Sequence, residues 1–404
     1  MTNKIIIIGG GHAGGMTAIY LRQNNYSGEI LIISNEGYLP YQRPALSKGF
    51  LTNEVKEERL YLKNTDYFKR NNINFLLKTN VKKIDRLKKI VIIDDEKSIS
   101  YDKLVLATGS EMIHINSSSS KILYLRTLDE SKKLREFLSN YNSLAIIGAG
   151  YIGLEVASAA SKKSLDVNIF EMGSRLMERS SSEIISDFFL TLHKKNGVTF
   201  NLNTAVNDVS DIDNGILIHS SKKKESISDF LVVGIGVTPN TKLAQECGLD
   251  CNNGIKVDKF GCTSDKNIFA TGDCTNHPNS IFNINIRLES VQNAVEQSKI
   301  VANNICGISK SYENVPWFWS DQYDAKLKIA GIKEGYDYQI QLGSVKKSSF
   351  SIISLKEDKV ICIESVNRSS DFTLAKKLIA SQKVMPKKIL VNSKKLLKEI
   401  MVNT

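Results

Sequence analysis

The fold is decided by residues 4–14, which read KIIIIGGGHAG. The four isoleucines form a short continuous apolar run, which is typical of a strand buried on both faces of a parallel sheet. Gly9, Gly11 and Gly14 follow the spacing G-x-G-x-x-G. The first glycine permits a tight turn, the second lets backbone approach a pyrophosphate, and the third lets a helix pack on the strand. We therefore expect a strand, a turn and a helix whose N-terminus faces phosphate groups.

The residues that follow complete this unit. The pattern predicts a helix around residues 18–22 and a second strand at 30–33, which ends near Asn35 and Glu36. An acidic residue about 20 positions beyond the glycines is where a ribose hydroxyl needs an acceptor. Residues 4–36 therefore predict one bound dinucleotide.

The same pattern recurs later in the chain. A predicted strand at 144–147 leads into Gly148, Gly150 and Gly153, and another at 167–170 ends at Glu171. A single glycine motif is weak evidence, but two complete strand–turn–helix–strand–acid units predict two bound dinucleotides.

Three further strands are expected at 103–106, 231–233 and 267–270. The first two end in small-residue turns, and the third ends at Asp273. Ligands of open α/β sheets bind at strand ends, so Asp273 could reach the ribityl or pyrophosphate part of a bound flavin nucleotide.

Composition narrows the class of protein. The 404 residues are 42% apolar and 24% charged, which is typical of a globular protein of two to four domains. No apolar run approaches the roughly 18 residues of a membrane helix. The first residues lack the basic, apolar and small-residue segments of a signal peptide. These features predict a cytoplasmic enzyme that does not associate with membranes.

The net charge of +11 has two interpretations. Only eleven of the 54 cationic residues are Arg, which argues against a nucleic-acid partner because base edges are often bound by Arg. Residues 321–404 carry +7 of the +11, and a basic surface can attract an acidic partner. The densest run contains Lys376, Lys377, Lys383, Lys387, Lys388, Lys394, Lys395 and Lys398. The alternative, a general excess of lysine, stays open.

The six cysteines include no C-x-x-C pair. Cys247 and Cys251 are four residues apart but flank a turn, so we expect no redox-active disulfide. The five histidines do not have metal-ligand spacing, and we expect no metal.

Four segments resemble a known family: residues 39–48 (LPYQRPALSK), 124–128 (YLRTL), 287–294 (RLESVQNA) and 315–323 (VPWFWSDQY). They are similar to the FAD-dependent NADH:ferredoxin reductases of bacterial oxygenase systems, and the similarity covers essentially the whole chain. Rubredoxin reductases and apoptosis-inducing factor are relatives of this family.

The resemblance implies an α/β fold with two Rossmann-like dinucleotide-binding domains, for FAD and NAD, and a C-terminal α+β domain. We expect a discontinuous FAD domain at 1–109 and 236–313, an NAD domain at 110–235 and a reductase domain at 314–404. Alternating apolar residues at 350–355 and 359–363 predict an antiparallel sheet in the last domain, followed by a helix at 371–382.

The resemblance also implies site residues. FAD is expected to contact Gly9, Gly11, Ala13, Gly14, Asn35, Glu36, Lys48, Val81, Arg126, Asp273 and Val291. The nicotinamide nucleotide is expected to contact Gly148, Gly150, Ile152, Gly153, Glu171 and Gly236. Further cofactor contacts are expected at Arg43, Ala107, Thr108 and Gly109. Lys48 would favour the reduced flavin, Glu155 would orient Lys48, and Trp319 would lie close to the isoalloxazine ring.

The implied activity is the transfer of hydride from NADH to FAD and of single electrons to a [2Fe–2S] ferredoxin that serves a cytochrome P450 or a ring-hydroxylating oxygenase. Glu171 favours NADH because it would repel a 2′-phosphate, although Arg175 nearby could accommodate one. The expected partner is an acidic ferredoxin or a rubredoxin, and the protein is expected to be a monomer or weak homodimer. Alternatives are a rubredoxin reductase, a flavin oxidase and a nucleic-acid-binding protein like apoptosis-inducing factor.

Overall fold

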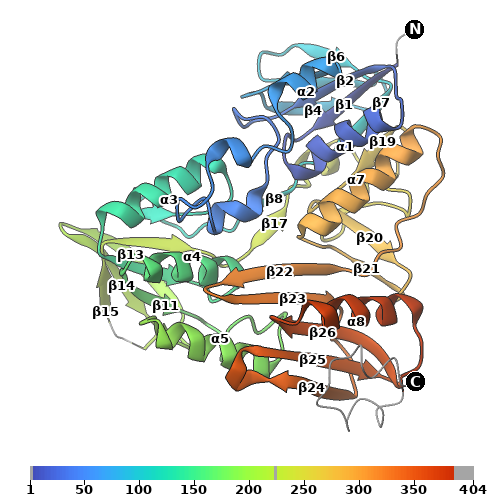
Figure 1. Ribbon diagram of the computed structural model, residues 1–404. Coiled ribbons are helices and arrows are strands. Elements are labelled where there is room, and N and C mark those ends of the chain that lie inside the picture. Colours follow the sequence, from blue (N-terminus) through green and yellow to red (C-terminus); the bar gives the residue numbers. More distant parts are fainter. Residues whose placement is uncertain (1–2, 223–224, 386–404) are drawn as a thin grey trace. The chain divides into compact units, whose positions relative to one another are not determined.

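The computed structural model describes residues 3–222 and 225–385 (Figure 1). The chain divides into two compact units. Unit 1 comprises the described parts of 1–42, 57–111 and 238–318. Unit 2 comprises those of 43–56, 112–237 and 319–404. Residues 43–56 fall inside the expected FAD domain by sequence but belong to unit 2. Each unit is described by itself.

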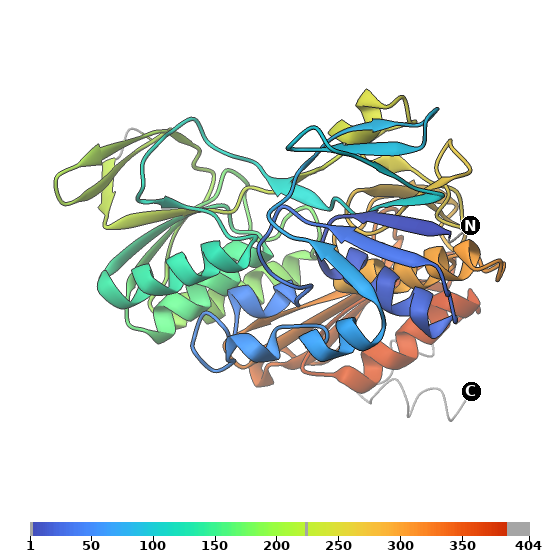
Figure 2. The same ribbon diagram turned by 90° about the horizontal axis from the view of Figure 1, so that it is seen from above.

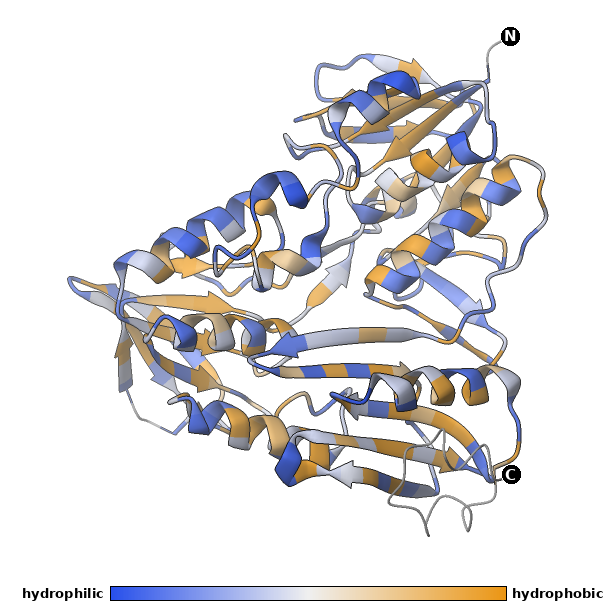
Figure 3. Cartoon of the chain, viewed as in Figure 1, coloured by the Kyte–Doolittle hydropathy of each residue, from blue (hydrophilic) through white to orange (hydrophobic). Residues whose placement is uncertain are grey.

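Unit 1 is built on a parallel five-stranded sheet of order β19-β7-β1-β2-β3. The strands are β1 (Lys4–Ile8), β2 (Glu29–Ile33), β3 (Ile73–Leu76), β7 (Lys103–Leu106) and β19 (Ile268–Ala270). Ile5 and Ile7 pack into the core on one face of β1, and Ile6 and Ile8 into the core on the other. The continuous apolar run is therefore a strand buried on both faces, as predicted, and the central strands are strongly hydrophobic in Figure 3.

Helices α1 (His12–Gln23) and α7 (Val291–Ile305) lie side by side on one face of this sheet (Figure 2). The other face carries the antiparallel sheet of β4 (Val81–Asp85), β5 (Ile90–Ile93) and β6 (Ser98–Ser100). The remaining elements are η2 (Glu57–Arg59), α2 (Thr65–Arg70), α6 (Lys242–Glu246), β18 (Ile255–Lys256), β20 (Thr275–Asn279) and β21 (Ile284–Ile286). Two strands, β8 (Ser110–Met112) and β17 (Val237–Pro239), pair where the chain passes between the units.

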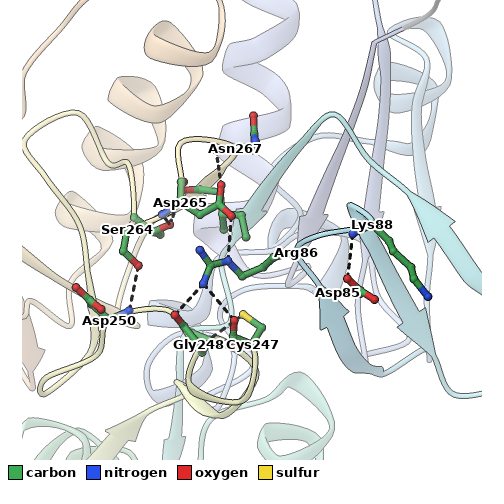
Figure 4. Close-up of polar contacts among 12 residues, drawn as sticks. Asp85, Arg86, Lys88, Cys247, Gly248, Asp250, Ser264, Asp265 and Asn267 are labelled. Atoms are coloured by element: carbon green, nitrogen blue, oxygen red, sulfur yellow. Dashed lines mark hydrogen bonds and ion pairs between the residues drawn. The ribbon is translucent and has the colours of Figure 1, made fainter.

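Arg86 connects three segments of unit 1 (Figure 4). Its Nε donates to Asp265 Oδ2 at 2.9 Å, and its Nη1 donates to the carbonyl oxygens of Gly248 at 2.8 Å and Cys247 at 3.3 Å. These carbonyls follow α6, so one guanidinium satisfies backbone acceptors just past the helix end while its charge is paired.

Unit 2 repeats the architecture with a second parallel sheet, of order β12-β11-β10-β16-β9. Its strands are β9 (Ile122–Leu123), β10 (Ser143–Ile147), β11 (Asp166–Phe170), β12 (Thr199–Asn201) and β16 (Phe230–Val233). The helical elements are η1 (Arg43–Ser47), α3 (Leu128–Asn140), α4 (Tyr151–Lys162) and α5 (Glu183–Lys195). The sheet of β13 (Val206–Ile212), β14 (Gly215–Ser220) and β15 (Glu225–Ser228) packs its apolar side chains against β10 and β16.

A third sheet in unit 2 has the order β22-β23-β26-β25-β24. Its strands are β22 (Trp317–Gln322, in this unit from Trp319), β23 (Ala325–Gly331), β24 (Tyr338–Ser344), β25 (Ser349–Lys356) and β26 (Lys359–Val366), and η3 (Val345–Lys347) and α8 (Ser369–Ser381) complete it. The sheet predicted from residues 350–363 is antiparallel, as expected, and the predicted helix is α8. The expected α/β fold class is confirmed. Within residues 3–222 and 225–385, no helix has the length and hydrophobicity needed to cross a membrane.

Candidate functional site

The first glycine turn in unit 1 leaves no room for side chains. Gly9 has φ +114°, and a Cβ there would lie 2.1 Å from the carbonyl oxygen of Ala107. A Cβ on Gly14 would lie 1.9 Å from the carbonyl oxygen of Gly9. Both contacts are with backbone atoms that cannot move aside, so only glycine fits and the first turn of α1 packs directly on β1 and β7.

The N-terminus of α1 is available to a ligand. Gly11 is the N-cap residue, and it has no side chain with which to cap the helix. The positive end of the helix dipole and the first backbone N–H groups favour an anionic ligand at this position. The carbonyl oxygen of Ala13 accepts a hydrogen bond from Ser298 on α7, and a Cβ on Gly272 would come within 2.9 Å of Ala13 Cβ. Asp273 follows Gly272, so the fold brings the acid at the end of β19 to the start of α1.

Other residues expected to contact FAD hold loops of unit 1. Glu36 accepts a hydrogen bond from the Tyr41 hydroxyl, and Asn35 beside it is exposed. Thr108 Oγ1 donates to the carbonyl oxygen of Asn240 at 2.7 Å, and Asn240 N donates to Gly109 O at 2.9 Å. These bonds tie the strand-end loop after β7 to the segment after β17. The remaining two residues, Val81 and Val291, begin β4 and α7.

The second glycine turn, in unit 2, repeats the first. A Cβ on Gly148 would lie 2.5 Å from the carbonyl oxygen of Gly234, and one on Gly153 would lie 2.2 Å from that of Gly148. Gly150, the N-cap residue of α4, differs because a Cβ there would meet no described atom within 4 Å. The side chain of Ile152 beside it is 41% exposed. The turn is thus packed on the sheet side and open on the side where a pyrophosphate would lie.

Glu171 closes this second nucleotide site at the end of β11. Its Oε2 accepts from the backbone N–H of Ala149 at 2.6 Å, and its Oε1 accepts from Gly173 N at 2.7 Å. Glu178 also lies close to Gly173, because a Cβ there would lie 2.4 Å from Glu178 Oε2 and 3.1 Å from Glu171 Oε1. Two carboxylates therefore meet at Gly173.

The Arg175 guanidinium donates to acceptors other than these two carboxylates. Its Nη1 donates to the carbonyl oxygen of Ser181 and to Ser186 Oγ, and its Nη2 donates to the carbonyl oxygen of Glu178, each at 2.8 Å. The guanidinium is thus occupied by the segment leading into α5. Gly236, the last residue expected here, has φ +117° and accepts a bond from Ile113 N.

A buried ion pair lies elsewhere in unit 2. Lys48 Nζ is 2.7 Å from Glu155 Oε2, and the side chain of Glu155 is only 2% exposed. Lys48 follows η1, which is fixed to α3 by a bond from Ser131 Oγ to the carbonyl oxygen of Leu46, at 2.8 Å. Arg43 at the start of η1 donates to the carbonyl oxygen of Arg126, at 2.6 Å. Arg43, Lys48 and Arg126 therefore share unit 2 with Glu155, and the other residues expected to bind FAD lie in unit 1.

Two serines that sequence reasoning missed also bind Glu155. Ser47 Oγ donates to Oε2 at 2.5 Å, and Ser320 Oγ donates to Oε1 at 2.6 Å. Both serines are buried. Ser320 follows Trp319 on β22, so the two side chains point to opposite faces of the strand. The feature of the sequence that could have indicated Ser320 is the run of polar residues 320–322 at the end of an otherwise aromatic strand.

The six cysteines are free thiols in the structure. Burial raises the pKa of every one of them, for Cys362 well above its ordinary value. Reactive cysteines have a lowered pKa, because the thiolate is the nucleophile. These thiols are therefore poorly suited to relaying electrons.

The fold and the site define a protein with two Rossmann-like units, each with a glycine turn, and a buried Lys–Glu pair. The chain belongs to the pyridine nucleotide-disulphide oxidoreductase family, whose model matches residues 3–298, and a reductase C-terminal model matches residues 317–401. The expected family resemblance is confirmed.

Individual relatives agree with this assignment. The chain is 40% identical to rhodocoxin reductase of Rhodococcus erythropolis, over 94% of this chain and 90% of the relative. It is 36% identical to a rubredoxin-NAD(+) reductase of Pseudomonas putida, over 90% of this chain and 95% of the relative. A crystal structure of a covalent putidaredoxin reductase–putidaredoxin complex matches with a TM-score of 0.95 at 34% identity, over 99% of this chain and 98% of the matched chain.

Proposed function

We propose that this protein is an NADH-dependent ferredoxin reductase, which supplies electrons one at a time to a [2Fe–2S] ferredoxin serving a cytochrome P450 or a ring-hydroxylating oxygenase. The observation that carries the proposal is the pair of glycine turns, each at the N-terminus of a helix with a glycine N-cap, within a chain whose relatives include a ferredoxin--NAD(P)(+) reductase. The residues present fit FAD and NADH, because each turn places the N-terminus of a helix with a glycine N-cap where a pyrophosphate would lie.

We assign FAD to the turn of unit 1 and NADH to the turn of unit 2. Gly9, Gly11 and Gly14 would hold the FAD pyrophosphate, with Asp273 beside it. Gly148, Gly150 and Gly153 would hold the NADH pyrophosphate, and Glu171 would accept from the adenosine ribose. The occupied state of Arg175 supports NADH over NADPH, since this guanidinium is already committed to three acceptors.

When bound, FAD supplies the acceptance of a hydride and the release of single electrons. Lys48 would place a positive charge where negative charge accumulates on reduction, and Glu155 would hold Lys48 in one orientation. Trp319, on β22, would lie close to the isoalloxazine ring. The raised pKa values of the cysteines favour direct electron delivery to the partner over a thiol relay.

The partner surface is proposed to be the basic C-terminal region. Lys377 and Lys383 are exposed on and after α8. Lys387, Lys388, Lys394, Lys395 and Lys398 lie outside the described residues. An acidic ferredoxin would be attracted to this surface over a distance set by ionic strength. A rubredoxin is the second candidate acceptor, because a rubredoxin-NAD(+) reductase is among the relatives.

The test begins with purified protein, which should be yellow after reconstitution with FAD and should bleach with NADH. Protein that stays colourless would overturn the assignment. Reduction of cytochrome c through purified ferredoxins and rubredoxins would then identify the acceptor. The rate through the correct partner should fall as salt rises, and charge reversal at Lys387, Lys388, Lys394 and Lys395 should lower it further. A rate insensitive to salt would exclude electrostatic docking.

A further inference from the structure

The Glu155 carboxylate stands at the end of a hydrogen-bonded chain that extends beyond the ion pair. Ser320 Oγ, which donates to Glu155 Oε1, itself accepts from Gln322 Nε2 at 3.1 Å. Gln322 Oε1 is 2.8 Å from His193 Nε2 on α5. His193, Ser320 and Gln322 are each 0% exposed. Four elements, α4, β22, α5 and η1, therefore contribute to one buried network.

The chain has a single direction. A carboxylate oxygen and an amide oxygen only accept hydrogen bonds, so Gln322 Oε1 requires that His193 carry its proton on Nε2. His193 Nδ1 must then accept, and the Tyr323 hydroxyl lies 3.2 Å from it. Every O–H and N–H from Tyr323 onward therefore points toward Glu155.

His193 is held in one neutral form. Burial lowers its pKa to about 4, against the smaller raising effect of the bond to Gln322. At neutral pH the ring is therefore uncharged, and its two partners leave a single tautomer. The imidazole ring of His193 contacts the rings of Phe200 and Tyr323 edge to face. The histidine is thus a fixed donor to Gln322.

The end of the hydrogen-bonded network that is farthest from Glu155 is also bonded to α4, the helix that carries Glu155. Tyr323 N donates to Ser158 Oγ at 2.9 Å, and Ser158 lies one turn after Glu155 on α4. Tyr323 has φ 55°, a left-handed conformation that is costly for a bulky residue. The end of β22 and the turn after it are therefore bonded to α4 at two points, through Ser320 to Glu155 and through Tyr323 to Ser158.

The network is unsuited to carrying protons. A side-chain amide does not take a proton on its oxygen and release one from its nitrogen under ordinary conditions, so Gln322 interrupts any relay between His193 and Ser320. What the chain can do is hold dipoles in a fixed orientation, which is the form of electrostatic stabilisation that costs no rearrangement during reaction.

We propose that Ser320, Gln322 and His193 are positioning residues that fix the Glu155 carboxylate and, through it, the Lys48 ammonium to which the proposed function gives a role toward FAD. The inference rests on the proposed function. Without the donor at Oε1, the Glu155 charge is directed more strongly at Lys48, and less of the lysine's positive field reaches the flavin. Reduced FAD is then bound less tightly relative to oxidised FAD.

The test measures the midpoint potential of FAD in the reconstituted holoenzyme. Ser320→Ala and Gln322→Met should each weaken the binding of reduced relative to oxidised FAD by up to about tenfold, a shift of about 30 mV to more negative potential for a two-electron couple. Ser320→Thr keeps the hydroxyl and should restore the wild-type potential. Tyr323→Phe, which preserves the packing, should give a smaller shift of the same sign.

The control is Phe189→Leu, one turn before His193 on α5 and equally buried, which should lower the melting temperature but leave the potential unchanged. A network with a purely structural role would show melting-temperature losses without any shift in potential, and that result would overturn the inference. Tyr323→Phe decides the matter if Ser320→Ala does not fold. Wild-type protein that binds no FAD, or that is not reduced by NADH, would instead refute the proposed function. If the midpoint potential shifts in Lys48→Met but in none of the Ser320, Gln322 and Tyr323 variants, only the role of the hydrogen-bonded network is refuted.

Discussion

Gly14 packs on Gly9 so closely that a Cβ at residue 14 would lie 1.9 Å from the Gly9 carbonyl oxygen. Gly153 has the same relationship to Gly148, at 2.2 Å. The two nucleotide turns thus share one backbone solution, although they lie in different units. The second turn also contains Gly150, which does not pack against backbone, so packing and nucleotide binding can be tested separately in this turn.

We predict that Gly153→Ala and Gly150→Ala fail in different ways. Gly153→Ala forces backbone apart and should lower the melting temperature by several degrees together with NADH affinity. Gly150→Ala adds a methyl group where no described atom lies within 4 Å, so stability should be unchanged while KM for NADH rises at least about tenfold. Thermal unfolding and steady-state kinetics measure the two effects. Equal stability losses would contradict this explanation.

The acidic pair at Gly173 predicts how nucleotide preference responds to mutation. Glu171→Gln should raise KM for NADH without making NADPH a good substrate, because Glu178 still faces the 2′-phosphate and Arg175 remains occupied. Glu171→Gln combined with Glu178→Gln should improve the NADPH:NADH ratio of kcat/KM by at least about tenfold over the single variant. A single variant that already prefers NADPH would show that Glu178 takes no part.

Arg86 predicts a stability effect confined to unit 1. Arg86→Met keeps most of the aliphatic stem but leaves Asp265 and two backbone carbonyls without this donor, which should cost about 2 kcal/mol of unfolding free energy. Lys88→Met is the control, since Lys88 is exposed and its side chain points away from the cluster (Figure 4). Denaturant unfolding of the two variants should differ, and equal midpoints would contradict the role of Arg86.

The pKa of Asp265 adds a pH dependence. Burial alone would raise it, but the bonds from Asn267 N and Arg86 lower the net pKa. A lowered pKa in the folded state gives stability that is present above the unfolded value, about 4, and is lost as pH falls through the folded value. Asp265→Asn should therefore be destabilised at pH 7 but should lose less stability than wild type on acidification. Parallel curves would contradict this.

For Glu364 we predict a pH dependence of stability that is opposite to that of Asp265. It is 0% exposed, its Oε1 accepts from Ser182 N at 2.8 Å, and its Oε2 has no partner among the described residues. Burial raises the pKa of its carboxyl. Between the unfolded pKa and this raised value the folded state binds more protons, so stability falls as pH rises.

Glu364→Gln cannot titrate and keeps an acceptor for Ser182 N. Its melting temperature should therefore exceed that of wild type near pH 7, with a gap that closes toward about pH 4. Calorimetry across this range is the measurement. A gap that is constant with pH would show that Glu364 is ionised in the folded protein.

Local sequence predicted the parts of the fold that depend on local rules. The glycine spacing and the apolar runs identified both parallel sheets, because turn geometry and burial on both faces act within about 30 residues. The antiparallel strands β25 and β26 were visible from alternation. The basic residues beyond Met385 remain predictions, because they lie outside the described residues.

The surroundings of Glu155 were not predictable in the same way. Glu155 was singled out by family resemblance, but its partners Ser47 and Ser320 are separated from it by more than 100 residues. His193 reaches the same network from α5, through Gln322. No spacing rule links these positions, because tertiary packing alone brings them together. A serine and a glutamine on a short strand gave no indication of which carboxylate they would serve.

The division of the chain into interleaved segments bears on how the protein is made. The backbone passes between the units five times, and unit 1 lacks its last segment until residue 318 has been synthesised. Neither unit can therefore finish folding early during translation, in contrast to proteins whose domains fold one after another from the N-terminus. Partly formed sheets, which are prone to aggregate, are therefore present for most of the synthesis of the chain. Truncation anywhere before residue 318 should leave both halves dependent on chaperones rather than releasing one folded unit.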